Sequence, residues 1–362
     1  MPLAGACRLQ IPFPTPPAFG EPLAVADGIR WLRLPLPFRL DHVNVFLVED
    51  GDGVAVVDTG IGDDATRAIW ERLLANEARR VTRVIGTHYH PDHVGMAGWL
   101  VERTGAPLLM SQSDYLTALT IQLAPEALEA EPWRSFYQAH GLGQDAAEQL
   151  LTSGHRYLRM LTGLPRTFRR LIAGETLELG ARRFKVLTGG GHAPEQIMLH
   201  CAEDNLLLVA DQVLLRISPN VSVQANDPWG DPLGIYLRSL AALKAEITAG
   251  TLVMPGHGLP FVGLHERIDE LTAHHAARCE MVVEACRARP LTAAALVPVV
   301  FGRTIDDPHQ MGFALGEALA HANMLLRQSR LSFGDGRYFT SGQAPSSSGR
   351  AASSGGISRI SL

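Results

Sequence analysis

Three histidines and an aspartate lie within six positions of THYHPDHVG, residues 87–95: His88, His90, Asp92 and His93. Side chains alternate along an extended segment, so His88 and His90 share one side. Pro91 then breaks the strand and lets Asp92 and His93 point toward a second position. Imidazole and carboxylate ligands without a thiolate suit zinc, and also manganese or iron. We therefore expect a metal site with further ligands from elsewhere, because one loop cannot complete two coordination spheres.

Three more residues with metal-binding side chains follow apolar segments later in the chain. His192 comes after KVLTGGG, where glycines let the backbone bend sharply. Asp211 follows NLLLVA, and His257 follows TLVMP. Sites built from loops belong at such strand ends. Each residue alone is more often an ordinary surface or core residue, but together with the HxHxDH pattern they indicate one site.

Strands and helices must position these residues. Residues 23–34 and 43–58 are predicted strands, the second range containing a hairpin turn. ATRAIWERLLANEAR has helical periodicity, and VTRVIGT is a short buried strand that leads directly into the histidine-rich loop. GMAGWLVERTGA is expected to form a helix that ends near Gly105.

The second half of the chain suggests a division into parts. Residues 111–170 are mostly helical in pattern and interrupt the strand-rich segments, which return with ETLELG and continue to TLVMP. From Leu264 the pattern is helical again and closes with a two-stranded turn in LSFGDGRYFTS. We predict a catalytic domain over residues 1–264, a C-terminal module over 265–340 and a flexible Ser/Gly-rich tail over 341–362.

The ordered pattern HxHxDH, His, Asp, His resembles the metallo-β-lactamase superfamily from residue 23 to about 262, and VDTG at 57–60 resembles its first motif. The resemblance implies an α/β fold, the αβ/βα four-layer sandwich with two mixed sheets inside and helices outside. It also implies two Zn²⁺ per chain, or manganese or iron, held by two ligand sets with a bridging aspartate: His88, His90 and His192 for one ion, Asp92, His93 and His257 for the other, and Asp211 between them. Asp58 would fix the metal loop from behind rather than bind a metal.

The ligand types narrow the reaction within this superfamily. The zinc β-lactamases have a cysteine or no bridging carboxylate where this chain has Asp211, and the flavodiiron oxygen reductases have a glutamate in place of His90. The chain is therefore similar to the dinuclear hydrolases such as glyoxalase II, lactonases and RNase Z-like phosphodiesterases, and we do not expect β-lactamase activity. A metal-bridging hydroxide would attack a carbonyl or phosphorus, while Asp92, Asp211 or both hold or relay its proton.

The leading expectation for the substrate is a small-molecule thioester, ester or lactone. The alternatives are a phosphodiesterase or endoribonuclease, and a metal-binding regulatory protein with little turnover. Residues 265–340 resemble the winged-helix-like module of hydrolases related to glyoxalase II, which accompanies RNA cleavage in some relatives. However, the net charge of -5 gives no electrostatic footprint for nucleic acid, and MLLRQSR supplies too few arginines for a groove. Nucleic acid is not expected as a partner, and the oligomeric state stays open.

Other residues are weaker candidates for contact with the substrate. His42, in LDHVNVF, and Glu195, in GHAPEQ, are expected near the cleft as substrate contacts or as support for the ligands. We expect the helical segment 111–170 to cap the metal cleft. Four of its side chains could face substrate, with helix packing as the alternative for each: Tyr115, Tyr137, Tyr157 and Arg166. Six further histidines have no metal-ligand spacing and are expected on the surface or in helix packing: His140, His155, His274, His275, His309 and His321.

The composition is that of a globular protein, with 46% hydrophobic and 19% charged residues. No apolar run approaches the roughly 20 residues that span a bilayer. The N-terminal segment MPLAGACRLQIPFPTPP lacks the basic start and apolar core of a signal peptide. The four cysteines show no CxxC spacing, which suits a reducing compartment. We therefore expect a cytoplasmic protein without a membrane partner.

Overall fold

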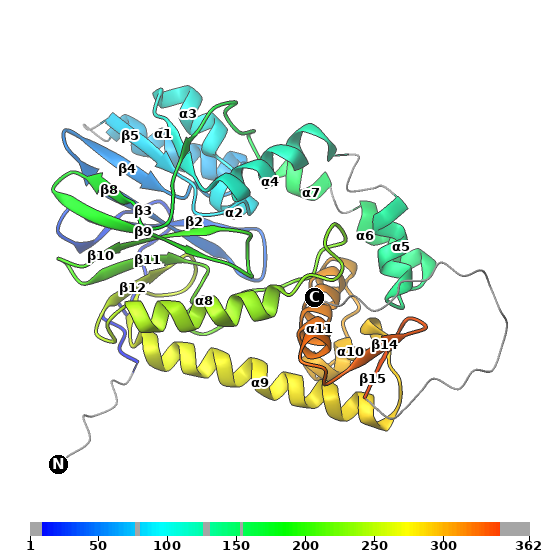
Figure 1. Ribbon diagram of the computed structural model, residues 1–362. Helices are drawn as coiled ribbons and strands as arrows, with labels where there is room; N and C mark the ends of the chain where they lie inside the picture. Colours follow the sequence, from blue (N-terminus) through cyan, green and yellow to red (C-terminus); the bar gives the residue numbers. More distant parts are fainter. Residues whose placement is uncertain (1–8, 77–79, 126–130, 153–154, 341–362) are drawn as a thin grey trace, which may run out of the picture.

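The computed structural model describes residues 9–76, 80–125, 131–152 and 155–340. Two β-sheets lie face to face at one end of the molecule, with helices on their outer sides (Figure 1). A group of helices and a small hairpin form the other end. The predicted α/β sandwich, followed by a helical C-terminal module, is confirmed.

The first sheet follows the chain order from β1 to β7. β1 to β4 pair antiparallel, and β4 to β7 pair parallel. The strands are β1 (Leu23–Ala26), β2 (Ile29–Pro35), β3 (His42–Asp50), β4 (Gly53–Val57), β5 (Arg80–Ile85), β6 (Leu108–Met110) and β7 (Arg169–Arg170). The tight turn between β3 and β4 uses Gly51 at a φ of 65°, a conformation that glycine adopts at little cost.

The second sheet has the order β13-β12-β11-β10-β9-β8. Only β11 and β12 pair parallel among the described strands of this sheet. Its strands are β8 (Thr176–Leu179), β9 (Arg182–Gly189), β10 (Gln196–Cys201), β11 (Leu206–Ala210), β12 (Leu252–Pro255) and β13 (Phe261–Val262). These strands carry the second half of the candidate site.

Alternate residues of each strand face opposite layers, as the period of a strand requires. Along β3, Val45 and Leu47 pack toward the helices outside the first sheet, while Phe46 and Val48 pack between the two sheets. Along β11, Leu206 and Leu208 belong to the core between the sheets, and neighbouring residues face the outer helices. Both faces of each sheet are therefore buried, which gives the strands their continuous apolar runs.

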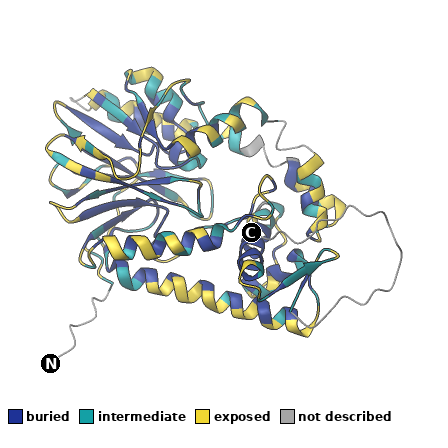
Figure 2. Cartoon of the chain, in the orientation of Figure 1, coloured by how far each residue is buried: buried dark blue, intermediate teal, exposed yellow. Residues whose placement is uncertain are grey.

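Helices cover the outer faces of both sheets. α1 (Asp64–Asn76) and α3 (Ala97–Thr104) lie on the first sheet, and α8 (Pro232–Glu246) and α9 (Leu264–Ala288) lie on the second. Figure 2 shows buried strands between helices whose outer faces are exposed. α3 ends as predicted at Gly105, which has a φ of 71° and donates its N–H to the carbonyl of Val101.

The helical segment 111–170 has two parts rather than one continuous cap. Its helices are α4 (Gln112–Leu123), α5 (Glu131–Ala139), α6 (Gln144–Thr152) and α7 (His155–Arg159). α4 packs on the core of the first sheet through Tyr115 and Ala118. α5 and α6 pack against the C-terminal helices instead, through Phe136 and the contact of α6 with α11 (Figure 1).

The C-terminal module contains α10 (Ala293–Phe301), α11 (Pro308–Arg327) and the antiparallel hairpin of β14 (Ser332–Gly334) and β15 (Arg337–Phe339). The expected two-stranded turn is thus present. α9 runs without a break from the second sheet into this module, so one helix connects the two. Among the described residues, no helix combines the length and apolar character that crossing a bilayer requires.

Candidate metal centre

The histidine-rich loop begins where β5 ends. His90 is extended, with φ -60° and ψ 145°, and Pro91 is the first residue of the short helix α2 (Pro91–Val94). Proline suits this position because its missing N–H is not needed there. The predicted break at Pro91 is therefore confirmed, and it separates His88 and His90 from Asp92 and His93.

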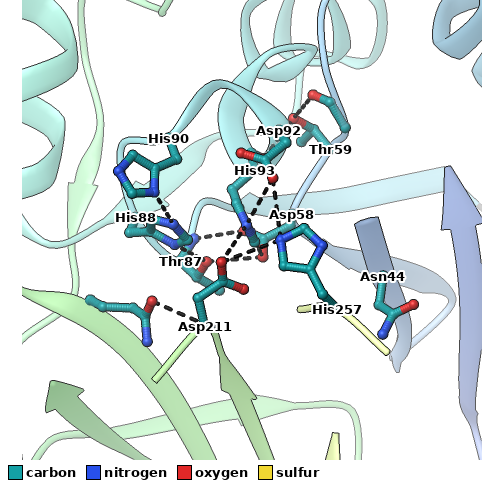
Figure 3. Close-up of polar contacts among 12 residues, drawn as sticks. Asn44, Asp58, Thr59, Thr87, His88, His90, Asp92, His93, Asp211 and His257 are labelled. Carbon is teal, nitrogen blue, oxygen red and sulfur yellow. Dashed lines mark hydrogen bonds and ion pairs between the residues drawn. The ribbon is translucent and has the colours of Figure 1, made fainter. Parts of the chain in front are cut away.

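The other three residues come together because their strands end at the same edge of the second sheet. β9 and β11 are each antiparallel to β10 and so run in one direction, and β12 is parallel to β11. His192 follows β9, Asp211 follows β11 directly, and His257 follows β12. This edge faces the loop after β5, so all seven predicted residues meet in one place. Figure 3 shows His88, His90, Asp92 and His93 of the loop close to Asp211 and His257.

The potential ligand atoms form overlapping groups within 4.8 Å of one another: His88, His90 and His192; Asp92, His93 and His257; and His88, His93 and Asp211. Asp211 joins the groups, because its Oδ2 lies 3.5 Å from His192 Nε2 and 3.3 Å from His257 Nε2. Asp92 Oδ2 also lies 3.3 Å from His257 Nε2. These distances place one carboxylate within reach of both predicted ligand sets.

Three imidazoles are oriented by an acceptor behind the ring. In each, Nδ1 is directed at that acceptor: His93 at the Asp58 carboxylate (2.7 Å), His192 at the Asn220 carbonyl (2.8 Å) and His257 at the His42 carbonyl (2.7 Å). An Nδ1–H that donates to such an acceptor leaves Nε2 as the atom that faces the centre. Such support is typical of histidines that bind metals.

The buried polar atoms of this centre fit a cation. His93 Nε2, His192 Nε2 and Asp211 Oδ1 are buried and have no hydrogen-bond partner among the described residues. Buried polar atoms are nearly always paired, so unpaired ones that converge indicate a missing ligand. Gly256 packs directly against the site, because a Cβ at this position would collide with Asp211 and His93. Nitrogen and oxygen donors without sulfur suit a borderline or hard divalent ion.

Burial and neighbouring charges shift the pKa values of the site's histidines in opposite directions. Burial and the neighbouring imidazole of His192 lower the pKa of His90 to about 3, so its ring is neutral. Burial alone would lower the pKa of His257, but Asp211 and Asp92 raise it to about 10. Burial would raise the pKa of Asp211, yet His257 and His93 hold it well below its usual value. An ion that binds His257 must therefore displace a proton.

Comparison with known proteins identifies the family. Residues 38–257 match the metallo-beta-lactamase superfamily, and residues 279–337 match the metallo-beta-lactamase-like C-terminal domain. The chain belongs to the metallo-β-lactamase superfamily. Two relatives are named as probable metallo-hydrolases, and the chain is a metal-dependent hydrolase of this superfamily.

Individual relatives extend over most of the chain. A β-lactamase domain protein from Burkholderia ambifaria has a crystal structure with 40% identity and a TM-score of 0.83, covering 92% of this chain and 97% of that one. The probable metallo-hydrolase YqjP of Bacillus subtilis (strain 168) is 26% identical over 312 residues, 81% of this chain and 91% of that protein. The atrochrysone carboxyl ACP thioesterase AgnL7 of Paecilomyces divaricatus is 23% identical over 278 residues, 75% of this chain and 70% of that protein.

Asp58, the aspartate of the superfamily's first motif, lies behind the metal loop. Its carboxylate is 2.7 Å from His93 Nδ1 and accepts hydrogen bonds from the Thr87 N–H (2.8 Å) and hydroxyl (2.9 Å). Asp58 has a φ of 62°, which is unusual for a residue other than glycine and is characteristic of constrained functional positions. The side chain thus holds both the start of the loop and one histidine.

The two weaker candidates lie at different distances from the centre. His42 supports His257 through its backbone carbonyl, and its ring Nε2 accepts a hydrogen bond from the N–H of Gly258. The Glu195 carboxylate accepts hydrogen bonds from the N–H and hydroxyl of Ser113, and no contact with a metal-site residue is found for it in the described ranges. Glu195 therefore ties the β9–β10 loop to α4.

Sequence reasoning missed four polar residues that support the site: Asn44, Asp114, Gln196 and Glu317. Asn44 donates its Nδ2 to the carbonyls of Pro255 and Gly258, on either side of His257. Asp114 accepts from the N–H groups of Tyr89 and Glu195 and so joins the two metal-site loops. Gln196 Oε1 accepts from the N–H of Asp211. Isolated amides and carboxylates carry no motif, so no signal in the sequence marks them.

Glu317 reaches the site through one intermediate residue, Asn220. Its carboxylate, on α11, accepts hydrogen bonds from Arg278 of α9 and from the side chain of Asn220 at 3.3 Å. The Asn220 carbonyl faces His192 Nδ1. The C-terminal module therefore contacts the segment that orients one of the candidate ligands.

Among the four cap residues, helix packing, the alternative to a substrate contact, is observed for Tyr115 and Tyr137. Tyr115 stacks on Phe168 and donates its hydroxyl to the Pro165 carbonyl, so it is a packing residue. Tyr137 packs beside Phe136 at the C-terminal helices. Tyr157 donates to the carbonyl of Tyr89, which lies between two predicted ligands, and Arg166 is exposed.

The remaining histidines and cysteines form no further metal group among the described residues. His275 and His321 face each other between α9 and α11, His140 packs on Phe136, and His274 is exposed. The side chains of His155 and His309, and Cys7, lie outside the described part of the chain. Cys201, Cys279 and Cys286 are buried free thiols.

Proposed function

We propose that this protein is a dinuclear-metal hydrolase, loaded with zinc, that cleaves a small-molecule thioester, ester or lactone. The observation that carries the proposal is the position of Asp211, whose Oδ2 lies within 3.5 Å of nitrogen atoms from both ligand sets. A bridging carboxylate has a purpose only when two ions are bound. Two ions held by these residues would polarise the substrate oxygen and lower the pKa of the attacking water.

The seven residues have distinct roles in this proposal. His88, His90 and His192 form one binding set, and Asp92, His93 and His257 form the other, with Asp211 shared. Asp92 is the more exposed of the two carboxylates, with 20% of its side chain accessible, so it can meet substrate and hold or relay a proton. Asp58, behind His93, keeps that ring in the orientation that the site requires.

Two observations support a small acyl substrate over a polyanion. The relative AgnL7 is named as an acyl-carrier-protein thioesterase, and this chain is net acidic. Nucleic-acid binding needs clustered Lys and Arg side chains to neutralise phosphates. We extend the proposal to the C-terminal module, which we interpret as a winged-helix-like element that packs against the site rather than binding RNA.

The test is a panel of substrates with the metal-loaded protein. Metal-free protein reconstituted with zinc, and separately with manganese, is assayed on an acyl thioester, a γ-lactone, a nitrophenyl ester, bis-nitrophenyl phosphate and RNA. We expect metal-dependent hydrolysis of the carbonyl substrates at rates well above those of the phosphodiesters. Cleavage of RNA with a steep salt dependence, and no hydrolysis of the carbonyl substrates, would support an endoribonuclease instead. Binding of metal without turnover of any substrate would support a regulatory protein.

A further inference from the structure

A cavity of about 170 Å³ lies beside the candidate metal centre. Most of its lining is aliphatic: Leu40, Leu214, Leu215, Ile217 and Leu259. The other lining residues are His42, His257, Gly258 and Arg216. Leu214 and Leu215 are fully buried in the fold, Leu40 and Leu259 are partly buried, and Ile217 is 47% exposed. The cavity therefore combines an apolar wall with an opening toward solvent.

The cavity adjoins the metal centre through His257. The His257 ring forms part of the lining, while its Nε2 lies 3.3 Å from oxygens of both Asp92 and Asp211. Leu214 and Leu215 also follow Asp211 in sequence after only two residues. One substrate molecule could thus place an apolar group in the cavity and its reacting group at the metals, with no long spacer between the two.

The leucine-rich wall is held in place by a buried arginine. Arg267, on α9, donates from Nε to the Leu214 carbonyl at 2.7 Å and from Nη2 to the Ile217 carbonyl at 3.0 Å. The remaining nitrogen, Nη1, pairs with Glu270. A preformed apolar wall favours binding because little ordering is needed when a ligand arrives. The cavity is therefore a built feature of the fold.

Arg216 does not make the cavity a polar site. Arg216 is exposed, so its aliphatic stem can line the wall while its guanidinium stays in water. No hydrogen bond or ion pair of that guanidinium is found within the described residues. The cavity itself can therefore hold a neutral hydrocarbon. The Arg216 guanidinium outside it can pair with an anionic part of the same ligand.

We propose that this cavity binds the hydrocarbon chain of the acyl group during hydrolysis, an inference that rests on the function proposed above. Sites for whole drug-sized ligands have volumes of about 300–1,000 Å³, so this smaller cavity fits only part of a substrate. The occupant is a short unbranched acyl chain, whose carbonyl lies at the metals next to His257. A long chain would extend past Ile217 into water, and its additional methylenes would add little binding free energy.

The first test measures how the rate depends on chain length. Acetyl, butanoyl, hexanoyl and dodecanoyl thioesters of N-acetylcysteamine are compared with the zinc-loaded wild type. We expect kcat/KM to rise by about fourfold for each added methylene, the factor that corresponds to ~0.8 kcal/mol per buried CH₂, and then to level off. A profile that is flat from acetyl to dodecanoyl would overturn the proposal.

The second test fills the cavity from two walls. Ile217→Trp and Leu259→Trp should each reduce kcat/KM for hexanoyl thioester at least tenfold and change the acetyl rate by less than threefold. Ile217 is about half exposed and lies outside the buried core, so its replacement leaves the core intact. Ile172→Trp is the matched control, because Ile172 is 41% exposed and lies outside the lining. Equal loss for acetyl and hexanoyl substrates in both variants would contradict a chain-binding role.

A binding measurement separates this proposal from the proposed function. The thioether S-hexyl-N-acetylcysteamine cannot be hydrolysed, and its binding is measured by calorimetry against the S-methyl compound. We expect tighter binding of the hexyl compound to wild type and to Ile172→Trp, and loss of that preference in Ile217→Trp. A hexyl preference without any hydrolysis would uphold the cavity and refute the esterase function. Hydrolysis without a hexyl preference would refute the cavity alone.

Discussion

The two halves of the metal centre are built in different ways. His88, His90, Asp92 and His93 come from one short loop, whereas His192, Asp211 and His257 come from three strand ends that are far apart in sequence. The loop is held mainly by Asp58, a buried carboxylate of its own sheet. The second half has one support from its own sheet, the hydrogen bond of the Asp211 N–H to Gln196 on β10, and further supports from outside that sheet. A contiguous motif can thus be held mainly by neighbouring elements, while a dispersed one also depends on distant parts of the fold.

The supports of the second half come from both ends of the molecule. Asn44, on β3 of the first sheet, donates to carbonyls on both sides of His257. Glu317, on α11 of the C-terminal module, holds Asn220, whose carbonyl faces His192 Nδ1. The second half is thus sensitive to how the two sheets and the C-terminal module pack together.

The largest effect is expected from changing Asp211, the residue that joins the two halves. Asp211→Ala removes the carboxylate shared by both ligand sets, so we expect kcat/KM to fall by at least about 10³-fold and bound zinc to fall below two ions per chain. Circular dichroism should be close to wild type because the core is apolar. Asp306→Ala, at an exposed aspartate, is the control and should leave both values unchanged. Near-normal turnover of Asp211→Ala would mean that no ligand bridges the halves.

The next effect tests the local support of the first half. Asp58→Asn keeps the shape of the side chain, and asparagine tolerates the positive φ of this position. The substitution removes the negative charge beside His93. Loss of such a carboxylate behind a ligand typically lowers metal affinity about 10–100-fold. Zinc titration against a competing chelator measures the change, and unaltered affinity would show that Asp58 acts only as a backbone anchor.

The smallest effect tests the distant support of the second half. Glu317→Gln weakens the pair with Arg278 and the hydrogen bond from Asn220, so the segment behind His192 loosens. Breaking a buried pair costs up to about 3–5 kcal/mol, and we expect a smaller loss here because glutamine retains one acceptor. Zinc affinity should fall severalfold, less than in Asp58→Asn.

A matched control separates this coupling from a general loss of charge. Glu280→Gln removes an exposed carboxylate that pairs with Arg330 on the other side of α9, and it should leave zinc affinity unchanged. Denaturation of the zinc-free variants gives the stability change independently of metal. If Glu317→Gln loses stability but binds zinc as tightly as wild type, the C-terminal module does not help to orient His192.

The sequence predicted the site residues that belong to a motif or directly follow an apolar strand. The HxHxDH spacing and the residues that follow β9, β11 and β12 were sufficient to name all seven residues that meet in space. Burial on both sheet faces produced apolar runs that identified most strands. No helix was predicted for the segment that forms α8, because apolar residues such as Ile235, which is 44% exposed, lie on its outer face and weaken the helical periodicity.

Residues that act through a single hydrogen bond could not be predicted. Asn44, Asp114 and Glu317 owe their importance to partners that are remote in sequence, such as the Pro255 carbonyl 211 positions from Asn44. The division of segment 111–170 was hidden for the same reason. Phe136 looks like any amphipathic helix residue until the C-terminal helices that bury it are in place. Long-range packing decides such positions, and local patterns carry no record of it.

The most direct test of the central claim locates the metal ions themselves. Crystals of zinc-loaded protein are measured at wavelengths on both sides of the zinc absorption edge, and elemental analysis of the same sample gives the stoichiometry. The account predicts two anomalous peaks per chain: one among His88, His90 and His192, the other among Asp92, His93 and His257, with Asp211 between them. One peak only, or no zinc at these residues, would contradict it.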